Sequence, residues 1–480
     1  MNHADRPDRM SDEGPDPSAS AVTSTATTIT TTTAAGIAPL ADRLLVAPYG
    51  VDRRGMLTVD EWRVADLVET YGSPMFIYSA NRMRCALTSL RAATHGRADL
   101  YFSIKANPHP AIIQVFLREG AGAEIASGAE YETARRAGVD PQRILFAGPG
   151  KSSAELRHVI DRGIGEIHVE AEDEIARISR IAAELETRVN ICLRINPVDS
   201  AQGGSMRMGG KPIQFGIDEE RIDAVIDAWR HDPWLQIAGI HLFAGTQILD
   251  AQVLVTQWSH ALELGRRIGR YLGQPLASID LGGGLGIPYV AHEQAIDIDL
   301  LTRLSEPLFN AVAGDPWLSG TRIVLEPGRF LVGEAGIYVT EVISVKESRG
   351  QWFIVTNGGM HHHLAATGNL GQVIKRDYPI VVATRMPLIG SDPPLEPHPM
   401  TIVGPLCTPL DTWGRKTALP MPVVGDLIAI LQSGAYGLSA SPNGFLSQPI
   451  AAEVLIDRQG PRLIRAGGTF ESPITPPIGF

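Results

Sequence analysis

The chain has 480 residues, of which 44% are hydrophobic and 20% are charged, and its formal net charge is −11. This composition is typical of a globular protein with material for more than one core, and not of a fibrous or disordered chain. The negative charge argues against a nucleic-acid partner, because no basic stripe is available to neutralise phosphates. Three scattered cysteines, Cys85, Cys192 and Cys407, favour a reducing cytoplasm over a disulfide framework.

The first region of the chain, residues 1–41, differs in composition from the rest. It is rich in Asp, Pro and Ser and then in Thr between Thr23 and Thr33, so we expect a disordered tail. Its acidic residues and its lack of a continuous apolar core argue against a secretory signal or a transit peptide. No later run is apolar over the length needed to cross a bilayer, so we expect no membrane partner.

Short apolar runs then alternate with longer stretches of helical period, which predicts a parallel sheet with helical crossovers. About eight strands can be counted, the number that closes a (β/α)8 barrel of the TIM type. The predicted strands are Leu100–Lys105, Ala121–Ala126, Arg143–Gly148, Glu166–Glu170, Val189–Ile195, Ile237–Phe243, Ser278–Gly282 and Arg322–Glu326. The predicted helices are Pro110–Arg118, Ala129–Ala137, Ser153–Asp161, Asp173–Leu185, Glu220–Trp229, Val253–Tyr271 and Leu300–Val312.

From Gly336 onward β-rich runs replace the helical period, which predicts a second, all-β domain. The runs are Ile337–Val345, Trp352–Val355, Ile380–Thr384, Thr401–Val403, Leu427–Leu431 and Glu453–Ile456, with a proline-rich loop at Pro387–Pro399. After the tail we therefore expect N-terminal strands in 42–72 that join this β-domain, a barrel in 73–335 and the β-domain itself in 336–480.

Nearly every predicted barrel strand ends in a polar residue or a glycine that packing alone does not require. Barrel enzymes carry their chemistry at the carboxyl ends of the strands, so these residues are expected to converge on one cavity. They are Lys105, Ser127 with Gly128, Gly148 with Lys151, Arg194, His241 with 245–247, the glycine-rich run 282–286, and Glu326 with Gly328 and Arg329.

Lys105 ends the first predicted barrel strand. A lysine at the mouth of a parallel sheet can lose its proton through desolvation and attack an aldehyde, such as that of pyridoxal phosphate, to form a Schiff base. Most lysines at strand ends are merely solvated, so this interpretation depends on the other strand ends.

The glycine run 282–286 and the segment Leu-Glu-Pro-Gly-Arg at 325–329 follow the last two predicted strands. Glycines let backbone N–H groups approach an anion, and the loops after the seventh and eighth barrel strands are a recurrent phosphate site, although the run can also be a flexible turn. Glu326 either forms a surface ion pair or holds a proton on a pyridine nitrogen, and Arg329 can hold a phosphate or a carboxylate.

In this order the motifs resemble those of the fold-type III pyridoxal-phosphate decarboxylases, the family of the diaminopimelate and ornithine decarboxylases, from about Leu45 to Leu455. The resemblance implies an alanine racemase-like barrel with a C-terminal β-domain, and a homodimer with shared active sites. The matching motifs are Ser-Ile-Lys-Ala-Asn around Lys105, Ala-Ser-Gly at 126–128 with Glu130, Gly-Thr-Gln at 245–247, Gly-Gly-Gly at 282–284, Glu-Pro-Gly-Arg at 326–329, Gly-Pro-Leu-Cys at 404–407 with Asp411, and Gly-Ala-Tyr at 434–436.

By that resemblance Lys105 binds the cofactor aldehyde and Glu326 pairs with the pyridinium nitrogen. Cys407 and Tyr436 would come from the partner subunit, as the proton donor and as a phosphate ligand; by themselves they could equally be a small buried residue and a core aromatic. The other residues implied at the cofactor are Ser127, Arg194, His241, Phe243, Gly282, Gly283, Gly284, Gly328 and Arg329, and those implied at the substrate are Arg329, Thr408 and Asp411. His241 is either a supporting residue or a hydrogen-bonded core histidine.

The chain departs from the family pattern at three places that affect substrate choice. Phe243 stands where relatives usually have a histidine that stacks on the cofactor ring, and a phenylalanine donates no proton. After Gly-Gly-Met at 358–360, diaminopimelate decarboxylases continue with an arginine and a tyrosine for the distal end of the substrate, but here His361–His363 and two alanines follow. Thr408 stands where the relatives carry an acidic residue. A free doubly charged substrate would therefore be poorly held, because a buried charge without a partner is costly.

This pattern is more similar to the decarboxylases of natural-product and exosortase-type clusters, some of which act on aminoacyl groups carried on an acyl-carrier protein. We therefore expect a cytoplasmic pyridoxal-phosphate-dependent decarboxylase for an amino acid or a carrier-bound aminoacyl group, with Cys407 as the favoured proton donor. Three alternatives remain: a diaminopimelate decarboxylase of lysine biosynthesis, an amino-acid racemase, and a non-catalytic pyridoxal-phosphate-binding protein. Glu326 disfavours the racemase, since such enzymes place arginine there.

Three adjacent histidines, His361–His363, suggest a metal at first sight. In an extended strand the outer two face one way and the middle one the other, and no carboxylate or cysteine lies at ligand spacing. We therefore expect no metal, and interpret the run as a pocket wall.

Overall fold

The computed structural model describes residues 49–198, 206–207, 212–243, 245–370, 375–386 and 396–473. The predicted tail in 1–41 lies outside these residues, and so does most of the predicted loop Pro387–Pro399. The described chain forms a barrel region and a β-rich region, and the β-rich region takes strands from both sides of the barrel in the sequence.

Eight parallel strands close into a barrel, because the last of them, β15, pairs with the first, β5. The fold class predicted from the sequence is thereby confirmed. The order around the barrel follows the chain: β5 (Ala98–Ser103), β6 (Gly122–Ile125), β7 (Ile144–Phe146), β8 (Glu166–Val169), β9 (Val189–Asn196), β12 (Leu235–Leu242), β14 (Ser278–Asp280) and β15 (Arg322–Leu325).

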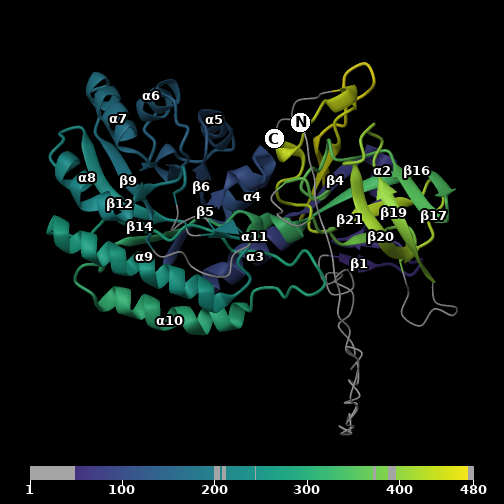
Figure 1. Ribbon diagram of the computed structural model, residues 1–480, viewed down its shortest axis with the longest axis horizontal. Helices are drawn as coiled ribbons and strands as arrows, with labels where there is room; N and C mark the ends of the chain where they lie inside the picture. The colour runs from purple at the N-terminus through teal and green to yellow at the C-terminus, as the bar shows by residue number, and fades with distance from the viewer. Residues whose placement is uncertain are drawn as a thin grey trace, which may run out of the picture. The chain divides into compact units, whose positions relative to one another are not determined.

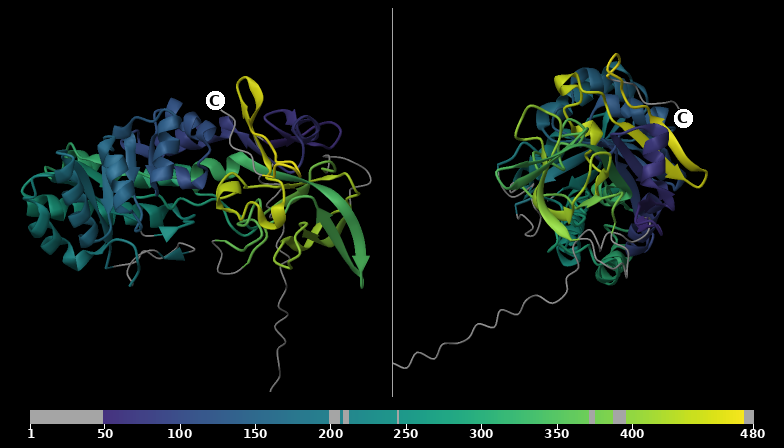
Figure 2. Two further views of the ribbon diagram at one scale, coloured as in Figure 1. Left: turned by 90° about the horizontal axis from the view of Figure 1, so that it is seen from above. Right: turned by 90° about the vertical axis from the view of Figure 1, so that its right-hand side faces the viewer.

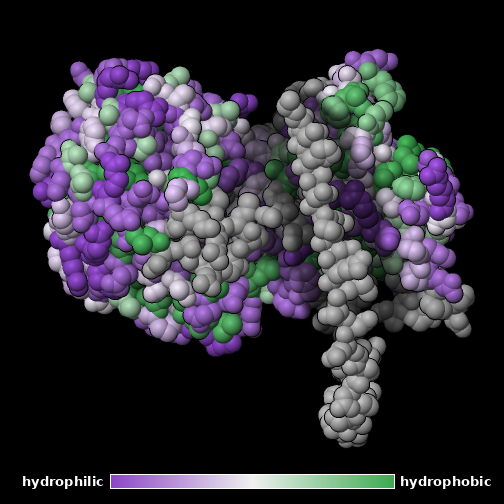
Figure 3. Space-filling model, in the orientation of Figure 1, coloured by the Kyte–Doolittle hydropathy of each residue, from purple (hydrophilic) through white to green (hydrophobic). Residues whose placement is uncertain are grey.

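Helices surround the barrel strands (Figure 1). Local sequence sets their starts: a capping box between Ser152 and Glu155 begins α6, and the Asp250 side chain accepts two backbone N–H groups at the start of α9. The helices are α3 (Ala80–Ala93), α4 (Pro110–Arg118), α5 (Gly128–Arg136), α6 (Ser153–Asp161), α7 (Glu172–Glu184), α8 (Ile222–Trp229), α9 (Ala251–Leu272) and α10 (Ile298–Gly314). Hydrophilic side chains cover much of the barrel face in Figure 3.

The second region is built on a sheet with the path β20-β19-β17-β16-β4-β22-β23, to which β21 is added beside β16 and β18 beside β21. Its strands are mostly antiparallel, and two views in Figure 2 show them from other sides. The strands are β4 (Met75–Ser79), β16 (Gly336–Ser348), β17 (Gln351–Thr356), β18 (Ile380–Val382), β19 (Pro397–Val403), β20 (Thr412–Pro420), β21 (Leu427–Ile430), β22 (Ala452–Asp457) and β23 (Gly460–Arg465).

Strand β4 corrects the predicted domain boundary at residue 73. All five of its residues are buried, and it pairs antiparallel with β16 and parallel with β22, at the centre of the second sheet. A short apolar run buried on both faces looks alike in a barrel and in a central sheet strand, so the sequence alone could not assign it. The barrel begins only after β4.

The segment before β4 forms a small sheet of its own. Its strands β1 (Tyr49–Val51), β2 (Leu57–Val59) and β3 (Trp62–Arg63) are antiparallel, and the helix α2 (Val64–Tyr71) follows. The Leu57 and Val59 side chains share an apolar cluster with Ile337 and Val339 of β16, and the Leu57 N–H donates to the Ala383 carbonyl. This sheet therefore packs on the β-domain without extending its main sheet.

A search of the described helices for a segment long and apolar enough to cross a membrane finds none.

Candidate active site

Lys105 lies directly after β5, in the short 3-10 turn η1 (Ile104–Ala106) at the carboxyl end of the barrel. Its Nζ atom donates to both oxygens of Glu124, at 2.8 and 2.7 Å. The Ser103 hydroxyl donates to the same carboxylate. Sequence analysis missed Glu124, although a charged residue inside the apolar strand β6 was a signal that could have revealed it.

The charges around Lys105 favour its protonated form when no aldehyde is attached. Burial alone would lower the pKa of Lys105, but the carboxylates of Glu124 and Glu326 raise it above its ordinary value. Burial would likewise raise the pKa of Glu124, yet Lys105 and the Ser103 hydroxyl lower it. The pair is therefore an ion pair, and the lysine must give up a proton before its nitrogen can attack an aldehyde.

Glu326 follows β15 and is buried within the same end of the barrel. Its backbone N–H donates to the Gly282 carbonyl, and its Oε1 atom has no hydrogen-bond partner among the described residues. Burial, together with the nearby carboxylates of Asp280 and Glu124, holds the pKa of Glu326 well above its usual range. The His241 Nε2 atom lies 3.4 Å from Glu326 Oε2. The site thus presents a carboxyl group with an unfilled bonding position.

The glycines at 282–284 form a cradle that side chains would fill. Gly282 and Gly284 have φ values of +71° and +88°, which favour glycine. A Cβ atom would lie 2.6 Å from the Leu242 carbonyl at Gly282, 2.4 Å from the Glu326 carbonyl at Gly283 and 2.5 Å from a backbone carbonyl at Gly284. Glycine is therefore required at each position, and a loop without side chains is of the kind that lets backbone N–H groups approach an anion.

Arg329 begins the short helix α11 (Arg329–Val332) and lies between two tyrosine rings. Its Nη1 atom donates to the Tyr289 hydroxyl at 2.9 Å, and its Cζ atom lies 4.8 Å from the centroid of the Tyr436 ring. Its Nε atom has no partner among the described residues. This guanidinium retains a donor for an anionic ligand.

Tyr436 corrects one expectation from the resemblance. Its N–H donates to the Ala106 carbonyl at 2.8 Å, directly beside Lys105, and its ring stacks on Arg329 of the same chain. Tyr436 therefore lies in its own chain's site, and not in that of a partner subunit. The reason is the loop after β21, which returns from the β-domain to the Lys105 turn, a long-range contact that no local pattern reveals.

Arg194 and Phe243 lie at the ends of neighbouring barrel strands. The Arg194 Nη1 atom donates to Glu170 Oε1 at 2.7 Å, and its guanidinium faces the Phe243 ring with Cζ 6.0 Å from the centroid. A Cβ atom on Gly282 would lie 3.1 Å from the Phe243 ring. The structure thus brings Phe243 to the glycine cradle, while Arg194 is engaged by Glu170.

Ser127 and Gly328 have positions that folding alone explains. The Ser127 hydroxyl caps helix α5 by accepting the Glu130 N–H at 3.1 Å. A Cβ atom on Gly328 would lie 3.1 Å from the Ser103 Cβ and 3.2 Å from the Ala106 Cβ. Gly328 therefore permits the close approach of the Glu326 segment to the Lys105 turn.

Cys407, Thr408 and Asp411 lie in a turn of the β-domain. Cys407 is exposed, and within the described residues of one chain it makes no hydrogen bond to the Lys105 site. Asp411 is buried, and its carboxylate accepts the N–H groups of Met360 at 2.7 Å and of Leu406 at 2.9 Å. Asp411 therefore connects the turn at Met360 to the turn at Leu406, and the hydrogen bonds of its carboxylate are made there and not to Lys105.

His361–His363 lie in a turn after β17, which corrects the expectation of an extended strand. All three rings are buried; His362 contacts the Tyr338 hydroxyl at 2.9 Å, whereas both ring nitrogens of His361 and His363 lack partners among the described residues. Burial lowers the pKa to about 4 for His361 and to about 3 for His362 and His363. The three imidazoles are therefore neutral at pH 7, and none of them supplies a positive charge.

Sequence analysis also missed two residues inside the barrel. His168 of β8 and Asp280 of β14 lie inside the barrel with His241 and Glu326, close enough together to form a metal-ligand type of cluster. The absence of a metal stays a prediction.

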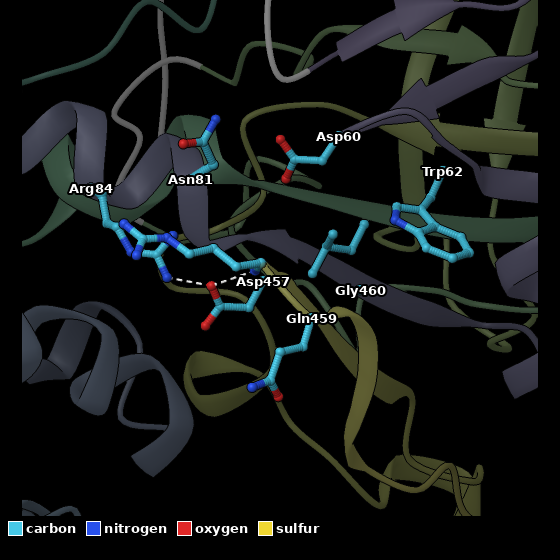
Figure 4. A pocket seen from close by; sticks show the side chains of 9 residues that line it. Asp60, Trp62, Asn81, Arg84, Asp457, Gln459 and Gly460 are labelled. Atoms are coloured by element: carbon cyan, nitrogen blue, oxygen red, sulfur yellow. Dashed lines mark hydrogen bonds and ion pairs between the residues drawn. The ribbon is translucent and has the colours of Figure 1, made fainter.

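A separate pocket of about 480 Å³ lies where the N-terminal sheet, α3 and the β22–β23 hairpin meet (Figure 4). Trp62 and Asp60 border it, and Arg84 pairs with Asp457 in its wall. None of the expected site residues lines it.

The residues at the carboxyl end of the barrel fit pyridoxal phosphate. A lysine amine, a carboxyl group with an orphaned oxygen, a cradle of backbone amides and a guanidinium with a spare donor match the aldehyde, the pyridine nitrogen and the phosphate of that cofactor. The family model "Pyridoxal-dependent decarboxylase, pyridoxal binding domain" matches residues 81–333, which include all of these groups.

The chain belongs to the pyridoxal-dependent decarboxylases. It is 36% identical to the L-glutamyl-[BtrI acyl-carrier protein] decarboxylase of Niallia circulans, over 86% of this chain and 95% of that protein. It is 31% identical to the diaminopimelate decarboxylase of Methanothermobacter thermautotrophicus, over 88% and 95% of the two chains.

Solved structures of the family have the same fold. The diaminopimelate decarboxylase of M. jannaschii in complex with L-lysine superposes with a TM-score of 0.80 at 25% identity, covering 89% of this chain and 98% of that one. The protein is thus a pyridoxal-phosphate-dependent lyase, as the strand-end residues predicted.

Proposed function

We propose that this decarboxylase removes the α-carboxylate of an aminoacyl group that is attached to a carrier protein. The main support is the stretch after Gly358, where a decarboxylase for a free diacid needs a cation for the distal carboxylate. Residues 358–370 contain no arginine or lysine, and their three histidines are held neutral by burial. A tethered end carries no such charge, so it needs no cation. The relative from Niallia circulans, named for a glutamyl group on a carrier protein, supports the same conclusion.

The site residues divide the reaction among them. When bound, pyridoxal phosphate supplies an aldehyde that joins to amines and a ring that accepts the electron pair left by departing carbon dioxide. Lys105 holds the cofactor until the substrate amine replaces it, and Glu124 stands ready to exchange a proton with the released amine. Glu326 would hold a proton at the pyridine nitrogen, Phe243 would contact the ring, and the glycine cradle with Arg329 and Tyr436 would bind the phosphate.

We further propose a homodimer in which Cys407 of one subunit serves the Lys105 site of the other. The support is that Cys407 is exposed on the β-domain of its own chain, whereas the decarboxylated carbon requires a proton donor. Thr408, beside it, places a neutral hydroxyl where a free amine at the distal end would need a carboxylate. The predicted cytoplasmic location stays a prediction.

The decisive experiment offers the purified holoenzyme two forms of the same substrate. Carbon dioxide release is measured with a glutamyl group on an acyl-carrier protein, with the same group on a short synthetic thiol, and with free glutamate, diaminopimelate and ornithine. We expect turnover of the carrier-bound form, weaker turnover of the synthetic thioester and almost none of the free amino acids. Efficient turnover of free diaminopimelate would contradict the proposal and favour an enzyme of lysine synthesis.

A further inference from the structure

The barrel interior contains a layer of polar side chains that the proposed mechanism leaves partly unused. Alternate strands of a barrel contribute one interior layer. Here β6, β8, β12 and the end of β15 are alternate strands, and they contribute Glu124, His168, His241 and Glu326. His168 and His241 are buried, and their Nδ1 atoms lie 3.0 Å apart. One of these nitrogens must carry a proton and the other must accept it.

The contacts of His168 on the side away from His241 show which of its two ring nitrogens carries a proton. The His168 Nε2 atom lies 3.2 Å from Glu166 Oε1, and Glu166 Oε2 accepts from the Ser278 hydroxyl at 2.8 Å and from Arg322 at 3.3 Å. Burial would raise the pKa of Glu166, but the hydrogen bond from His168 and the charge of Arg322 lower it. Glu166 is therefore an ionised acceptor, and His168 Nε2 carries the proton.

The tautomers of both rings follow from this end point. With its proton on Nε2, His168 can accept at Nδ1, in which case His241 donates from Nδ1 and presents an unprotonated Nε2. That atom lies 3.4 Å from Glu326 Oε2 and makes no hydrogen bond among the described residues. Burial, with His168 next, lowers the pKa of His241 well below its usual value, so this ring is neutral.

Glu326 completes the chain as the proton donor. The charged groups that face it are Asp280 from β14, Glu124 from β6 and Lys105 from η1, with the His168 ring on β8. Burial raises the pKa of Asp280 to about 7, so a second carboxyl group beside Glu326 also resists ionisation. Burial and the two carboxylates outweigh the Lys105 ammonium, so Glu326 is a neutral acid and the negative charge of the chain resides on Glu166.

We propose that His168 and His241 form a two-imidazole relay that moves this negative charge from Glu166 to Glu326 when a protonated pyridine ring binds beside Glu326. The Glu326 proton passes to His241 Nε2, the His241 Nδ1 proton passes to His168 Nδ1, and the His168 Nε2 proton passes to Glu166. Protons balance, because three move by one step each and none reaches solvent. The inference rests on the proposed pairing of Glu326 with the pyridine nitrogen, and it makes His168 a positioning residue.

The test measures cofactor binding in place of turnover. Apoenzyme is titrated with pyridoxal phosphate between pH 6.5 and 8.5, for the wild type and for His168→Gln, and calorimetry in two buffers of different ionisation enthalpy counts the protons released. Glutamine can bond to both neighbours but cannot pass a proton. In this variant Glu326 must lose its proton to solvent, so we expect about one additional proton released per site. The ratio of variant to wild-type Kd should grow about tenfold per pH unit as the pH falls.

Two further variants keep the result interpretable. Glu166→Gln removes the charge at the far end and should show the same extra proton, so the test survives if His168→Gln does not fold. His363→Gln exchanges a buried histidine outside the relay and should leave the proton count unchanged. A variant-to-wild-type ratio that is independent of pH, with equal proton release, would overturn the relay. Failure of the wild type itself to bind pyridoxal phosphate would instead overturn the proposed function.

Discussion

The ring of Tyr436 covers the guanidinium of Arg329 in the same chain, with the Arg329 Cζ atom 4.8 Å from the ring centroid. Tyr436 is held there with a φ of +54° by the bond from its N–H to the Ala106 carbonyl. Such a backbone conformation is costly for a residue with a side chain, so the surrounding contacts must enforce it. The β-domain thus reaches into the barrel site of its own chain.

Mixed dimers separate the residues that act within one chain from those that act across the subunit boundary. Lys105→Ala and Cys407→Ala chains, each inactive alone, are co-expressed with two different tags and purified as hybrids. If Cys407 acts across the boundary, each purified hybrid has one intact site of two, so it should regain about half of wild-type activity, as a two-fold dimer requires.

The matched pair for that experiment is Lys105→Ala with Tyr436→Ala. Because Tyr436 and Lys105 belong to one site in one chain, every site of the hybrid carries one defect, and no activity should return. Restored activity with Tyr436→Ala would contradict the position found here. An inactive Cys407 hybrid would contradict the shared site.

Replacement of Glu124 by glutamine should change the pH at which apoenzyme captures its cofactor. Glu124 and Glu326 raise the pKa of Lys105, so removal of the Glu124 charge lowers that pKa and leaves more neutral amine at pH 7. We expect the rate of covalent capture of pyridoxal phosphate, followed by borohydride-fixed absorbance, to rise several-fold at pH 7 and its pH profile to move to lower pH. Glu130→Gln is the control, because Glu130 accepts the Ala126 N–H and does not bond to Lys105. An unmoved profile would show that Glu124 does not hold the ammonium.

The phosphate cradle is tested by Gly282→Ala. Its Cβ atom would lie 2.6 Å from the Leu242 carbonyl at a φ of +71°, so the loop must move. We expect loss of roughly 1–3 kcal/mol of stability and at least a tenfold weaker hold on the cofactor, measured by dialysis and absorbance. Gly320→Ala is matched in backbone strain, with φ of +84° and no atom within 4 Å of the added Cβ, and it lies away from the site. Cofactor retention equal to that of Gly320→Ala would argue against a cradle at Gly282.

Buried His363 should make the fold sensitive to acid. Burial lowers the pKa of His363 from 6.5 to about 3, so between these values the unfolded chain gains a proton that the folded chain refuses. Stability is therefore complete above pH 6.5 and falls with decreasing pH, by about 1.4 kcal/mol per unit for each such histidine. The ring packs between Phe76 and Tyr378, so His363→Phe should fold, and its loss of unfolding free energy from pH 7 to 5 should be smaller by about 2 kcal/mol.

Urea midpoints at the two pH values measure this difference. His398→Phe is the control, since His398 is exposed and its exchange should leave the acid sensitivity unchanged. An equal acid sensitivity of His363→Phe and the wild type would show that His363 is protonated in the folded state.

Several features of the site could be predicted from local sequence because they lie at strand ends. Lys105, the glycine cradle and Glu326 each follow a short apolar run, and in a parallel barrel all strand carboxyl ends meet on one face. The interior residues Glu124, His168 and Asp280 escaped notice for the opposite reason. Each lies within a strand, where a single polar residue among apolar residues does not show which other residues it contacts.

From the amino-acid sequence by itself, periodicity predicted the barrel, and the resemblance of its motifs implied the cofactor chemistry and the lack of a cation for a distal carboxylate. These inferences depend on local pattern and on residue types at element ends. Only the tertiary structure decided that β4 belongs to the second sheet, that Tyr436 lies against Arg329 of its own chain and that two buried histidines lie between Glu326 and Glu166. These are contacts between residues far apart in the chain, and their geometry depends on how the strands close around a common interior.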